Sequence, residues 1–173
     1  MISAGVPVLP GSDGIVSNFY EAKEIAEGIG FPVILKAVAG GGGKGMRIVN
    51  THNDLESAFD TAEAEAQASF NNGDLYLEKY IKRPRHIEVQ ILGDTSGNIV
   101  SLGERECSIQ RRHQKLIEET PCLALRDEDR TKLMEFSRLG GSFINYVGAG
   151  TIEFLMDESY NFYFMEMNTR IQV

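Results

Sequence analysis

The sequence has few cysteines and prolines, no tryptophan and no long hydrophobic run. Two cysteines, Cys107 and Cys122, cannot build a disulfide framework and lack metal-ligand spacing, which favours ordinary packed thiols in a reducing compartment. Only 5 prolines accompany 42% hydrophobic and 24% charged residues, a composition typical of globular proteins rather than of disordered or collagen-like chains. Because the longest apolar runs, such as 31–35, are far shorter than the ~20 residues of a membrane helix, we expect no membrane segment.

Basic residues are also in the minority. The 17 Lys and Arg stand against 25 Asp and Glu, and the net charge of -8 argues against broad binding to the phosphate backbone of nucleic acids. No basic residue precedes Lys23, so the start of the sequence resembles neither a secretory signal nor a transit peptide. We therefore expect a cytoplasmic protein, or a protein of the mitochondrial matrix if a transit peptide precedes this sequence.

The hydrophobic pattern predicts short strands interspersed with a few helices. Helices are expected at 19–29, 53–70 and 127–139, and strands at 31–38, 46–49, 75–81, 87–91, 99–102, 151–156 and 162–168. Because most strands follow one another through turns rather than through crossover helices, the order indicates an α+β fold with antiparallel sheet. A basic hinge at 82–85 divides the sequence into two lobes.

A glycine-rich loop, Gly40 to Gly45, lies between two predicted strands. The loop fits the pattern G-x-G-x-x-G, but in a dinucleotide-binding fold this loop begins a helix, whereas Met46–Val49 is strand-like. A P-loop is also disfavoured, because it would need Ser or Thr at position 45, where this sequence has glycine. A glycine-rich hairpin can lay backbone N–H groups over nucleotide phosphates, because glycine has no Cβ to hold the main chain away. Lys36, at the end of the preceding strand, is expected to contact the same phosphates. The alternative for the loop is a mobile linker, and the alternative for Lys36 is a side chain that extends into water at the end of the strand.

Two carboxylates are predicted to converge from neighbouring strands. Glu153 lies in an otherwise apolar strand, and period-two alternation places Glu166 and Asn168 on one face of the next. Such hard oxygen ligands suit Mg²⁺, which is commonly held by one or two carboxylates plus substrate phosphates. Arg170, one step further on the same face, is expected to meet an anion brought by the metal. An exposed polar face with Glu–Arg pairs is the alternative.

A dense cluster of hydrogen-bond donors runs from Gln110 to Lys115. The cluster contains no aromatic residue on which a base could stack, so single-stranded nucleic acid is a poor fit. A pocket for a small anion fits better, and a solvated basic loop is the alternative.

Together these motifs resemble the biotin carboxylases, a family of ATP-grasp ligases. The resemblance covers essentially the whole sequence. Its most specific parts are the run from Gln110 to Lys115 and the run from Glu166 to Val173; the related carbamoyl phosphate synthetases share the glycine loop but lack the first run. Further matching segments are Gly40 to Met46, Glu78 to Ile81, Pro84 to His86 and Gly148 to Phe154.

The resemblance implies an ATP-grasp fold in which two lobes grip ATP. Residues 8–81 would form the lid subdomain, 82–173 an incomplete large lobe with antiparallel sheet, and 1–7 the end of a preceding domain or a linker. The implied ATP contacts are Lys36, Gly40, Gly41, Gly42, Gly43, Lys44, Gly45, Met46, Glu78, Lys79, Tyr80, Ile81, His86, Gln110 and His113. Glu153, Glu166 and Asn168 would hold Mg²⁺ or Mn²⁺. Lys115, Arg170, Gln172 and Val173 would surround bicarbonate, with Lys115 and Arg170 as catalytic residues.

The implied reaction is ATP-dependent phosphorylation of bicarbonate to carboxyphosphate, followed by CO2 transfer to biotin on a carrier protein. A biotin carboxyl carrier, a carboxyltransferase and a second copy in a homodimer are the implied partners, without nucleic acid or membrane. Because the family motif continues past Val173 with Glu-His-Pro, we expect an incomplete domain that is inactive by itself. Another ATP-grasp carboxylate–amine ligase and a non-catalytic nucleotide-binding module stay open as alternatives.

Overall fold

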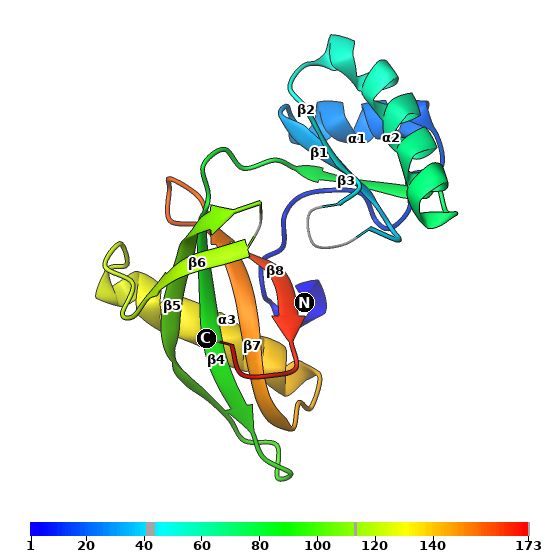
Figure 1. Cartoon of the computed structure of the whole chain (residues 1–173). Helices are drawn as coiled ribbons and strands as arrows, with labels where there is room; N and C mark the ends of the chain where they lie inside the picture. Colours follow the sequence, from blue (N-terminus) through cyan, green and yellow to red (C-terminus); the bar gives the residue numbers. More distant parts are fainter. Residues whose placement is uncertain (41–43, 113, 173) are drawn as a thin grey trace. The chain divides into compact units, whose positions relative to one another are not determined.

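The fold is α+β with antiparallel sheets, as predicted (Figure 1). The computed structural model describes residues 1–40, 44–112 and 114–172. The chain divides into two compact units: a small unit, Leu9–Ile81, and a large unit formed by Met1–Val8 and Lys82–Val173. Each unit has its own sheet and its own hydrophobic core. None of the described helices has the length and apolar character needed to cross a membrane.

The small unit is a three-stranded antiparallel sheet packed by two helices. Its elements in chain order are α1 (Phe19–Ile29), β1 (Val33–Ala37), β2 (Met46–Val49), the 3-10 helix η2 (His52–Asp54), α2 (Leu55–Phe70) and β3 (Leu75–Lys79). β1 is the central strand. α1 begins after Asn18, whose Oδ1 accepts hydrogen bonds from the N–H groups of Tyr20 and Glu21, which stabilises the helix start. Leucines of the outer and central strands and small residues of the helices fill the core, among them Ala22, Ala26, Leu35, Ala66 and Leu77.

The large unit is a five-stranded antiparallel sheet with one long helix. Its elements are η1 (Ile2–Ala4), β4 (Arg85–Gly93), β5 (Ile99–Arg111), β6 (Gln114–Glu119), α3 (Asp127–Phe143), β7 (Gly148–Met156) and β8 (Phe162–Asn168), and the strand order is β6-β5-β4-β7-β8. Alternate residues of β4 and β7, including Ile87, Val89 and Ile152, form the core with Leu133 of α3. Because side chains alternate along a strand, the opposite face of the sheet carries the polar residues of the candidate site.

β5 and β6 depart from the sequence prediction. The strand predicted at 99–102 continues to Arg111, and the run predicted as a polar loop, Gln110 to Lys115, instead includes the end of β5 and the start of β6. Glu104, Arg105 and Glu106 follow one another in the middle of β5. Polar side chains therefore occupy both faces of this strand, and the apolar alternation on which the prediction depended is missing.

α3 is longer than predicted. Gly140 and Gly141 were expected to lie beyond the end of the helix, but the helix continues through both to Phe143. Both glycines are buried, and a Cβ atom at Gly141 would lie 3.1 Å from Ile91 Cδ1. These glycines therefore allow close packing of helix and sheet rather than ending the helix.

The first residues of the chain pack on the large unit. Residues 1–7 were predicted to end a preceding domain or to form a linker. Val6 is buried in the core of this unit, and the Phe164 N–H donates to the Pro7 carbonyl at 2.8 Å. Val8 forms a parallel bridge with Phe164, so this segment extends the sheet beyond β8.

Candidate functional site

A row of charged side chains crosses the polar face of the large sheet. Glu88 of β4 lies opposite Glu153 of β7; Arg105 of β5 lies opposite Glu88, and Glu166 of β8 lies opposite Glu153. Glu88 is fully buried and Glu153 is 2% exposed. Like charges that face each other across strands are destabilising, so this pair of buried carboxylates requires nearby cations.

Lys115 supplies one of these cations at the start of β6. Its Nζ donates to Glu88, to Glu153 Oε1 at 2.9 Å and to Gln172 Oε1 at 2.7 Å. Arg105 Nε donates to the other oxygen of Glu88. Burial by itself would lower the pKa of Lys115, but the hydrogen bonds to Glu88 and Glu153 outweigh it and raise that pKa. Lys115 therefore carries a fixed positive charge at neutral pH.

Glu153 is the centre of this network. It accepts hydrogen bonds from His86, from Lys115, from Asn168 Nδ2 at 2.8 Å and from Gln172 Nε2 at 3.0 Å. Burial alone would raise the pKa of Glu153, but the bonds from His86 and Lys115 outweigh it and lower the pKa to about 2. Glu153 is therefore an ionised carboxylate whose orientation is fixed from several sides.

His86 links Glu153 to Gln110. Gln110 Nε2 lies 2.7 Å from His86 Nδ1 and also donates to the Cys107 carbonyl at 2.7 Å. Because an amide nitrogen can only donate, His86 Nδ1 is the acceptor, and the ring hydrogen on Nε2 points to Glu153. Two of the three side chains predicted to line the nucleotide thus lie together beside the predicted metal ligand; the third, His113, lies outside the described residues.

The three predicted metal ligands converge as expected from their spacing. Glu153 and Glu166 face each other across β7 and β8, and Asn168 Nδ2 lies 2.8 Å from Glu153 Oε1 and 3.5 Å from Glu166 Oε1. Two carboxylates and a carboxamide are hard oxygen donors of the kind that Mg²⁺ takes. A cation between Glu153 and Glu166 would also relieve the repulsion of the facing carboxylates. These residues therefore fit a magnesium ion once the ion replaces a donor now bonded to Glu153 and the Asn168 amide oxygen turns toward it.

The residues predicted to surround bicarbonate are only partly brought together. Gln172 is 8% exposed and contacts both Lys115 and Glu153. Arg170 is exposed, and its guanidinium donates to the Ile171 carbonyl at 3.3 Å. Within residues 114–172 and the other described parts, no ion pair of Arg170 is found. Val173 lies outside the described residues.

In the small unit, the half-buried side chain of Lys36 is paired with a carboxylate. Its Nζ lies 2.5 Å from Glu78 Oε2 and 5.7 Å from the centre of the Tyr76 ring. The neighbouring strand β3 presents both partners, because Lys36 lies opposite Tyr76 and next to the Ile34–Glu78 pair. An anion that binds Lys36 must therefore compete with the Glu78 carboxylate.

The glycine loop follows directly after β1. Gly45 has φ 73° and a Cβ atom there would lie 2.8 Å from Ala37 Cβ; a Cβ at Gly40 would lie 2.6 Å from the Lys44 carbonyl oxygen. Glycine is therefore required at both ends of the loop, whose residues 41–43 lie outside the described residues. Met46 begins β2. In the segment 78–81, which is predicted to contact ATP, Lys79 Nζ donates to the Gly30 and Phe31 carbonyls, and Tyr80 N–H donates to the Pro32 carbonyl. Ile81 ends the unit.

Sequence reasoning missed Glu88 and Arg105. Glu88 stood out only as the polar half of an alternating strand, which is also the pattern of a solvent-exposed face. The available signal was its position two residues after His86, because both side chains must then share a face. Arg105 was missed because it lies in a run of polar residues in the middle of β5, where no apolar alternation indicates a strand.

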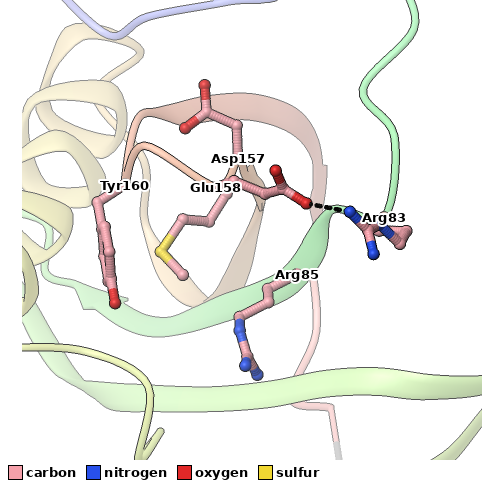
Figure 2. A pocket seen from close by; sticks show the side chains of 6 residues that line it. Arg83, Arg85, Asp157, Glu158 and Tyr160 are labelled. Atoms are coloured by element: carbon pink, nitrogen blue, oxygen red, sulfur yellow. Dashed lines mark hydrogen bonds and ion pairs between the residues drawn. The ribbon is translucent and has the colours of Figure 1, made fainter.

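Two further clusters of charged side chains are present in the large unit: one lies apart from this site, and the other shares Glu88 with it. Figure 2 shows a hollow lined by Arg83, Arg85, Met156, Asp157, Glu158 and Tyr160. Arg83 pairs with Glu158 at 2.7 Å, and Arg85 pairs with Glu106 at 2.5 Å. Both arginines of the hollow are thus already neutralised by carboxylates.

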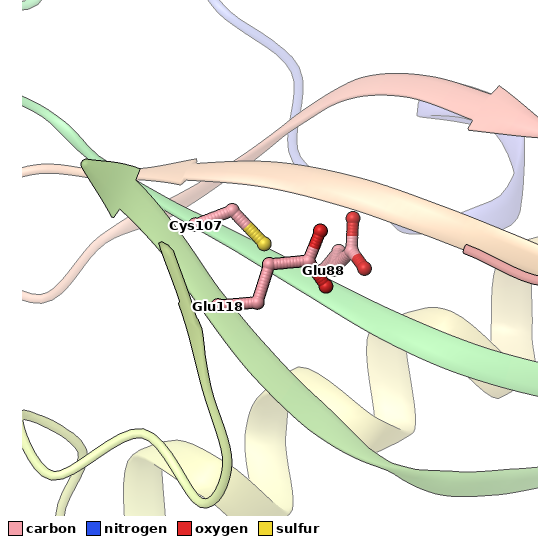
Figure 3. A group of neighbouring side chains, drawn as sticks. All are labelled: Glu88, Cys107 and Glu118. Atoms are coloured by element: carbon pink, nitrogen blue, oxygen red, sulfur yellow. The ribbon is translucent and has the colours of Figure 1, made fainter. Parts of the chain in front are cut away.

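The second cluster joins Glu88, Cys107 and Glu118, whose candidate ligand atoms all lie within 4.8 Å of one another (Figure 3). Both oxygens of Glu88 are taken by Arg105 and Lys115. Burial, and next the charge of Glu88, raise the pKa of the Cys107 thiol to about 12. Because a thiol binds metal as the thiolate, this environment disfavours a metal ion.

Comparison with known proteins identifies the family of the chain. A family model described as "Carbamoyl-phosphate synthase L chain, ATP binding domain" matches residues 1–173. The biotin carboxylase of Nostoc sp. is 56% identical over 173 residues, which are 100% of this chain and 39% of that protein. The chain thus spans well under half the length of this relative.

Solved structures agree with the sequence comparison. The biotin carboxylase–beta-gamma-ATP complex from Campylobacter jejuni has a TM-score of 0.91 and 56% identity, over 99% of this chain and 39% of that one. The biotin carboxylase domain dimer of 2-oxoglutarate carboxylase from Hydrogenobacter thermophilus, in complex with MgADP, ADP and bicarbonate, has a TM-score of 0.89 and 53% identity, over 99% and 38% of the two chains.

Proposed function

From the premise that this chain belongs to the carbamoyl-phosphate synthase L chain ATP-binding domains, and among them to the ATP-grasp domains of biotin carboxylases, we propose that it binds ATP and phosphorylates bicarbonate as part of a biotin carboxylase. The product would be carboxyphosphate, from which CO2 passes to a nitrogen of carrier-bound biotin. The observation that carries the proposal is the buried network of Lys115, Glu88, Glu153 and Gln172.

Lys115 and Gln172 would bind bicarbonate. Lys115 is held charged and oriented by two buried carboxylates, so it offers a pre-positioned cation. Gln172 adds a carboxamide beside it, and Arg170 and Val173 would complete the anion site. An oxygen of bicarbonate would then attack the γ-phosphorus of ATP, with ADP as the leaving group.

Lys36 and the glycine loop would hold the phosphates of ATP. The ammonium of Lys36 would exchange the Glu78 carboxylate for a phosphate oxygen, a charge-assisted contact in either case. Loop residues 40–46 would contribute backbone N–H groups. Glu78 and Ile81 would meet the adenine through their backbones, Lys79 and Tyr80 would contact ATP beside them, and His86, Gln110 and His113 would line the nucleotide.

Glu153, Glu166 and Asn168 would hold Mg²⁺ or Mn²⁺ beside the phosphates. When bound, the ion neutralises charge that develops on the phosphate oxygens. The contribution of this chain is to keep Glu153 ionised and oriented through His86 and Lys115.

The proposed partners follow from the same reaction. Biotin is carried to the site on a carboxyl carrier protein or domain, and the carboxylated carrier is used by a carboxyltransferase. We propose a homodimer, in accord with the domain dimer of the Hydrogenobacter relative, and a location in the cytoplasm or in the mitochondrial matrix.

The proposal is tested in a hybrid in which this chain replaces the matching 173 residues of the Nostoc enzyme. We expect ATP cleavage that depends on bicarbonate and is stimulated by biotin. Cleavage that responds to an amine acceptor instead would identify a different ligase, and nucleotide binding without cleavage would identify a non-catalytic module.

Lys36→Met in this hybrid tests the phosphate contact. We expect ATP binding measured by calorimetry to weaken by about 1.5–3 kcal/mol, the scale of a charge-assisted contact. Lys132→Met removes the same charge from the exposed face of α3 and serves as the control. Equal ATP affinity in Lys36→Met and in the control would contradict the assignment.

A further inference from the structure

We propose that Thr151 is a positioning residue of the bicarbonate site and that it acts by holding the main chain at Arg170. This inference rests on the proposed function, because it concerns the segment that carries Arg170 and Gln172. Thr151 itself touches neither Lys115 nor the predicted metal ligands through its hydroxyl. Its effect would therefore pass through the backbone.

The hydroxyl of Thr151 is fully buried on the same face of β7 as Glu153. Thr151 Oγ1 lies 3.1 Å from the Arg170 carbonyl oxygen and 3.2 Å from Gln90 Oε1. A hydroxyl has one hydrogen, so it can donate fully to only one of these oxygens. Which oxygen receives it depends on the orientation of the Gln90 carboxamide.

The surroundings of Gln90 fix that orientation. Gln90 Nε2 donates to the Gly150 carbonyl at 2.8 Å, and Gln90 Oε1 accepts from Arg105 Nη2 at 3.3 Å. The carboxamide cannot be turned over without losing both contacts. Gln90 Oε1 already accepts from the guanidinium, whereas among the described residues the Arg170 carbonyl has no donor other than Thr151. Donation of the Thr151 hydrogen to the Arg170 carbonyl therefore leaves both oxygens with a partner.

The segment beyond β8 has little else to hold it. The β7–β8 ladder ends at the Thr151–Asn168 pair, and Figure 1 shows the chain turning back across the sheet after β8. Among the described residues, no main-chain hydrogen bond joins residues 169–172 to another part of the backbone. The attachments are the Thr151 hydroxyl at Arg170 and the side chain of Gln172 on Lys115 and Glu153.

The two attachments are only two residues apart, so they are expected to reinforce each other. With Arg170 held, Gln172 reaches Lys115 and Glu153 without a large loss of chain entropy. Without the Thr151 hydroxyl, the segment gains freedom, and the Gln172 carboxamide spends less time beside Lys115. The proposed anion site would then be less well formed before bicarbonate arrives.

Hydrogen–deuterium exchange of this chain tests the anchor directly. Thr151→Val removes the hydroxyl and keeps the β-branched shape, whereas Thr151→Ser keeps the hydroxyl. We expect the carboxamide hydrogens of Gln172, which are bonded to Glu153, to exchange about three- to tenfold faster in Thr151→Val, and near the wild-type rate in Thr151→Ser. Amides of β4 and β7 report whether the sheet itself is intact. Unchanged exchange of the Gln172 carboxamide in Thr151→Val, or equal acceleration in both variants, would overturn the proposal.

Kinetics of the hybrid test the functional consequence. Thr151→Val is expected to raise the KM for bicarbonate about three- to tenfold while the KM for ATP stays unchanged, and Thr151→Ser is expected to restore the bicarbonate KM. Equal increases in both KM values, or no rescue by serine, would overturn the positioning role. A parent hybrid without bicarbonate-dependent ATP cleavage would instead contradict the proposed function, and the exchange result would still decide the anchor.

Discussion

Buried carboxylates in this protein depend on specific donors, and Glu106 shows this away from the candidate site. Glu106 accepts hydrogen bonds from Cys122 Sγ at 3.1 Å, Arg85 Nη1 at 2.5 Å and Ser108 Oγ at 2.9 Å. Burial, and next the bond to Glu106, raise the pKa of the Cys122 thiol to about 11, so Cys122 keeps the proton that it donates. Burial alone would raise the pKa of Glu106, but these three donors outweigh it and lower the pKa.

A lowered carboxyl pKa predicts a stability that is lost in acid. The contribution of Glu106 is fully present above the ordinary carboxyl pKa and disappears as the pH falls through the lowered pKa of the folded state. We expect Glu106→Gln to lower the free energy of unfolding by about 1–3 kcal/mol at pH 7. We also expect a shallower fall of stability between about pH 5 and pH 3 than in the wild type. Urea titrations over this pH range measure both.

Glu158→Gln is the matched control for this prediction. Glu158 pairs with Arg83 at the surface, where both side chains are mostly exposed. An exposed ion pair contributes little, so we expect a change within about 0.5 kcal/mol at any pH. Similar losses in the two variants would mean that the donors of Glu106 do not contribute beyond an ordinary surface pair.

At the scale of single elements, the loop after β1 requires glycine for a geometric reason. Gly45 combines φ 73° with a Cβ position only 2.8 Å from Ala37 Cβ and 3.0 Å from the Phe70 ring. Gly45→Ala is therefore expected to lower the free energy of unfolding by more than about 1 kcal/mol and to weaken ATP binding by the hybrid, because the backbone must move. Urea unfolding and calorimetry measure the two effects.

Gly28→Ala, in the same unit, is expected to have the opposite effect on the free energy of unfolding. Gly28 lies in α1, and a Cβ atom there meets nothing within 4 Å. Alanine should stabilise this exposed helix position by about 0.5–1 kcal/mol and leave ATP binding unchanged. Stabilisation by alanine at both positions would show that the loop does not need its left-handed conformation.

The elements also show which parts of the fold the sequence predicts. α1 and β7 have clear apolar periodicity, and both lie close to their expected bounds. Only residues 99–102 of β5 were predicted and β6 was missed, because both faces of β5 contact polar groups. Glu104 contacts Arg130 of α3 on one side, and Arg105 contacts Glu88 on the other. Hydrophobic alternation is absent wherever a strand separates two polar networks.

In the candidate site, too, some contacts could be predicted from the sequence and others could not. Glu153, Glu166 and Asn168 lie on consecutive strands of a hairpin, so their proximity follows from period-two spacing. The contacts of Lys115 with Glu88 and Glu153 depend on the order of strands in the sheet, which local spacing does not contain. Arg170 shows the limit of spacing alone, because the chain leaves the strand after Asn168 and its side chain no longer follows the face of β8.

At the scale of the whole molecule, the hydrophobic cores of the two units have no residue in common within the part of the chain that the structure describes. The core of the small unit includes Leu77 of β3, and the core of the large unit includes Leu133 of α3; both leucines are fully buried. Leu77→Ala and Leu133→Ala each remove the same buried atoms, with an expected cost of about 2–5 kcal/mol. If each unit is stabilised by its own core, each cost should be confined to one unit.

Hydrogen–deuterium exchange separates the two responses. In Leu77→Ala we expect amide protection to fall in β1 and β3 while β4 and β7 keep theirs, and in Leu133→Ala we expect the reverse. Amide protection is expected to fall only in the mutated unit, because that unit can open without exposing the core of the other unit to water. Loss of protection across both units in either variant would show one cooperative folding unit instead. In that case the Lys36 region and the Lys115 network would be stabilised together, and Gly45→Ala should then also loosen the large sheet.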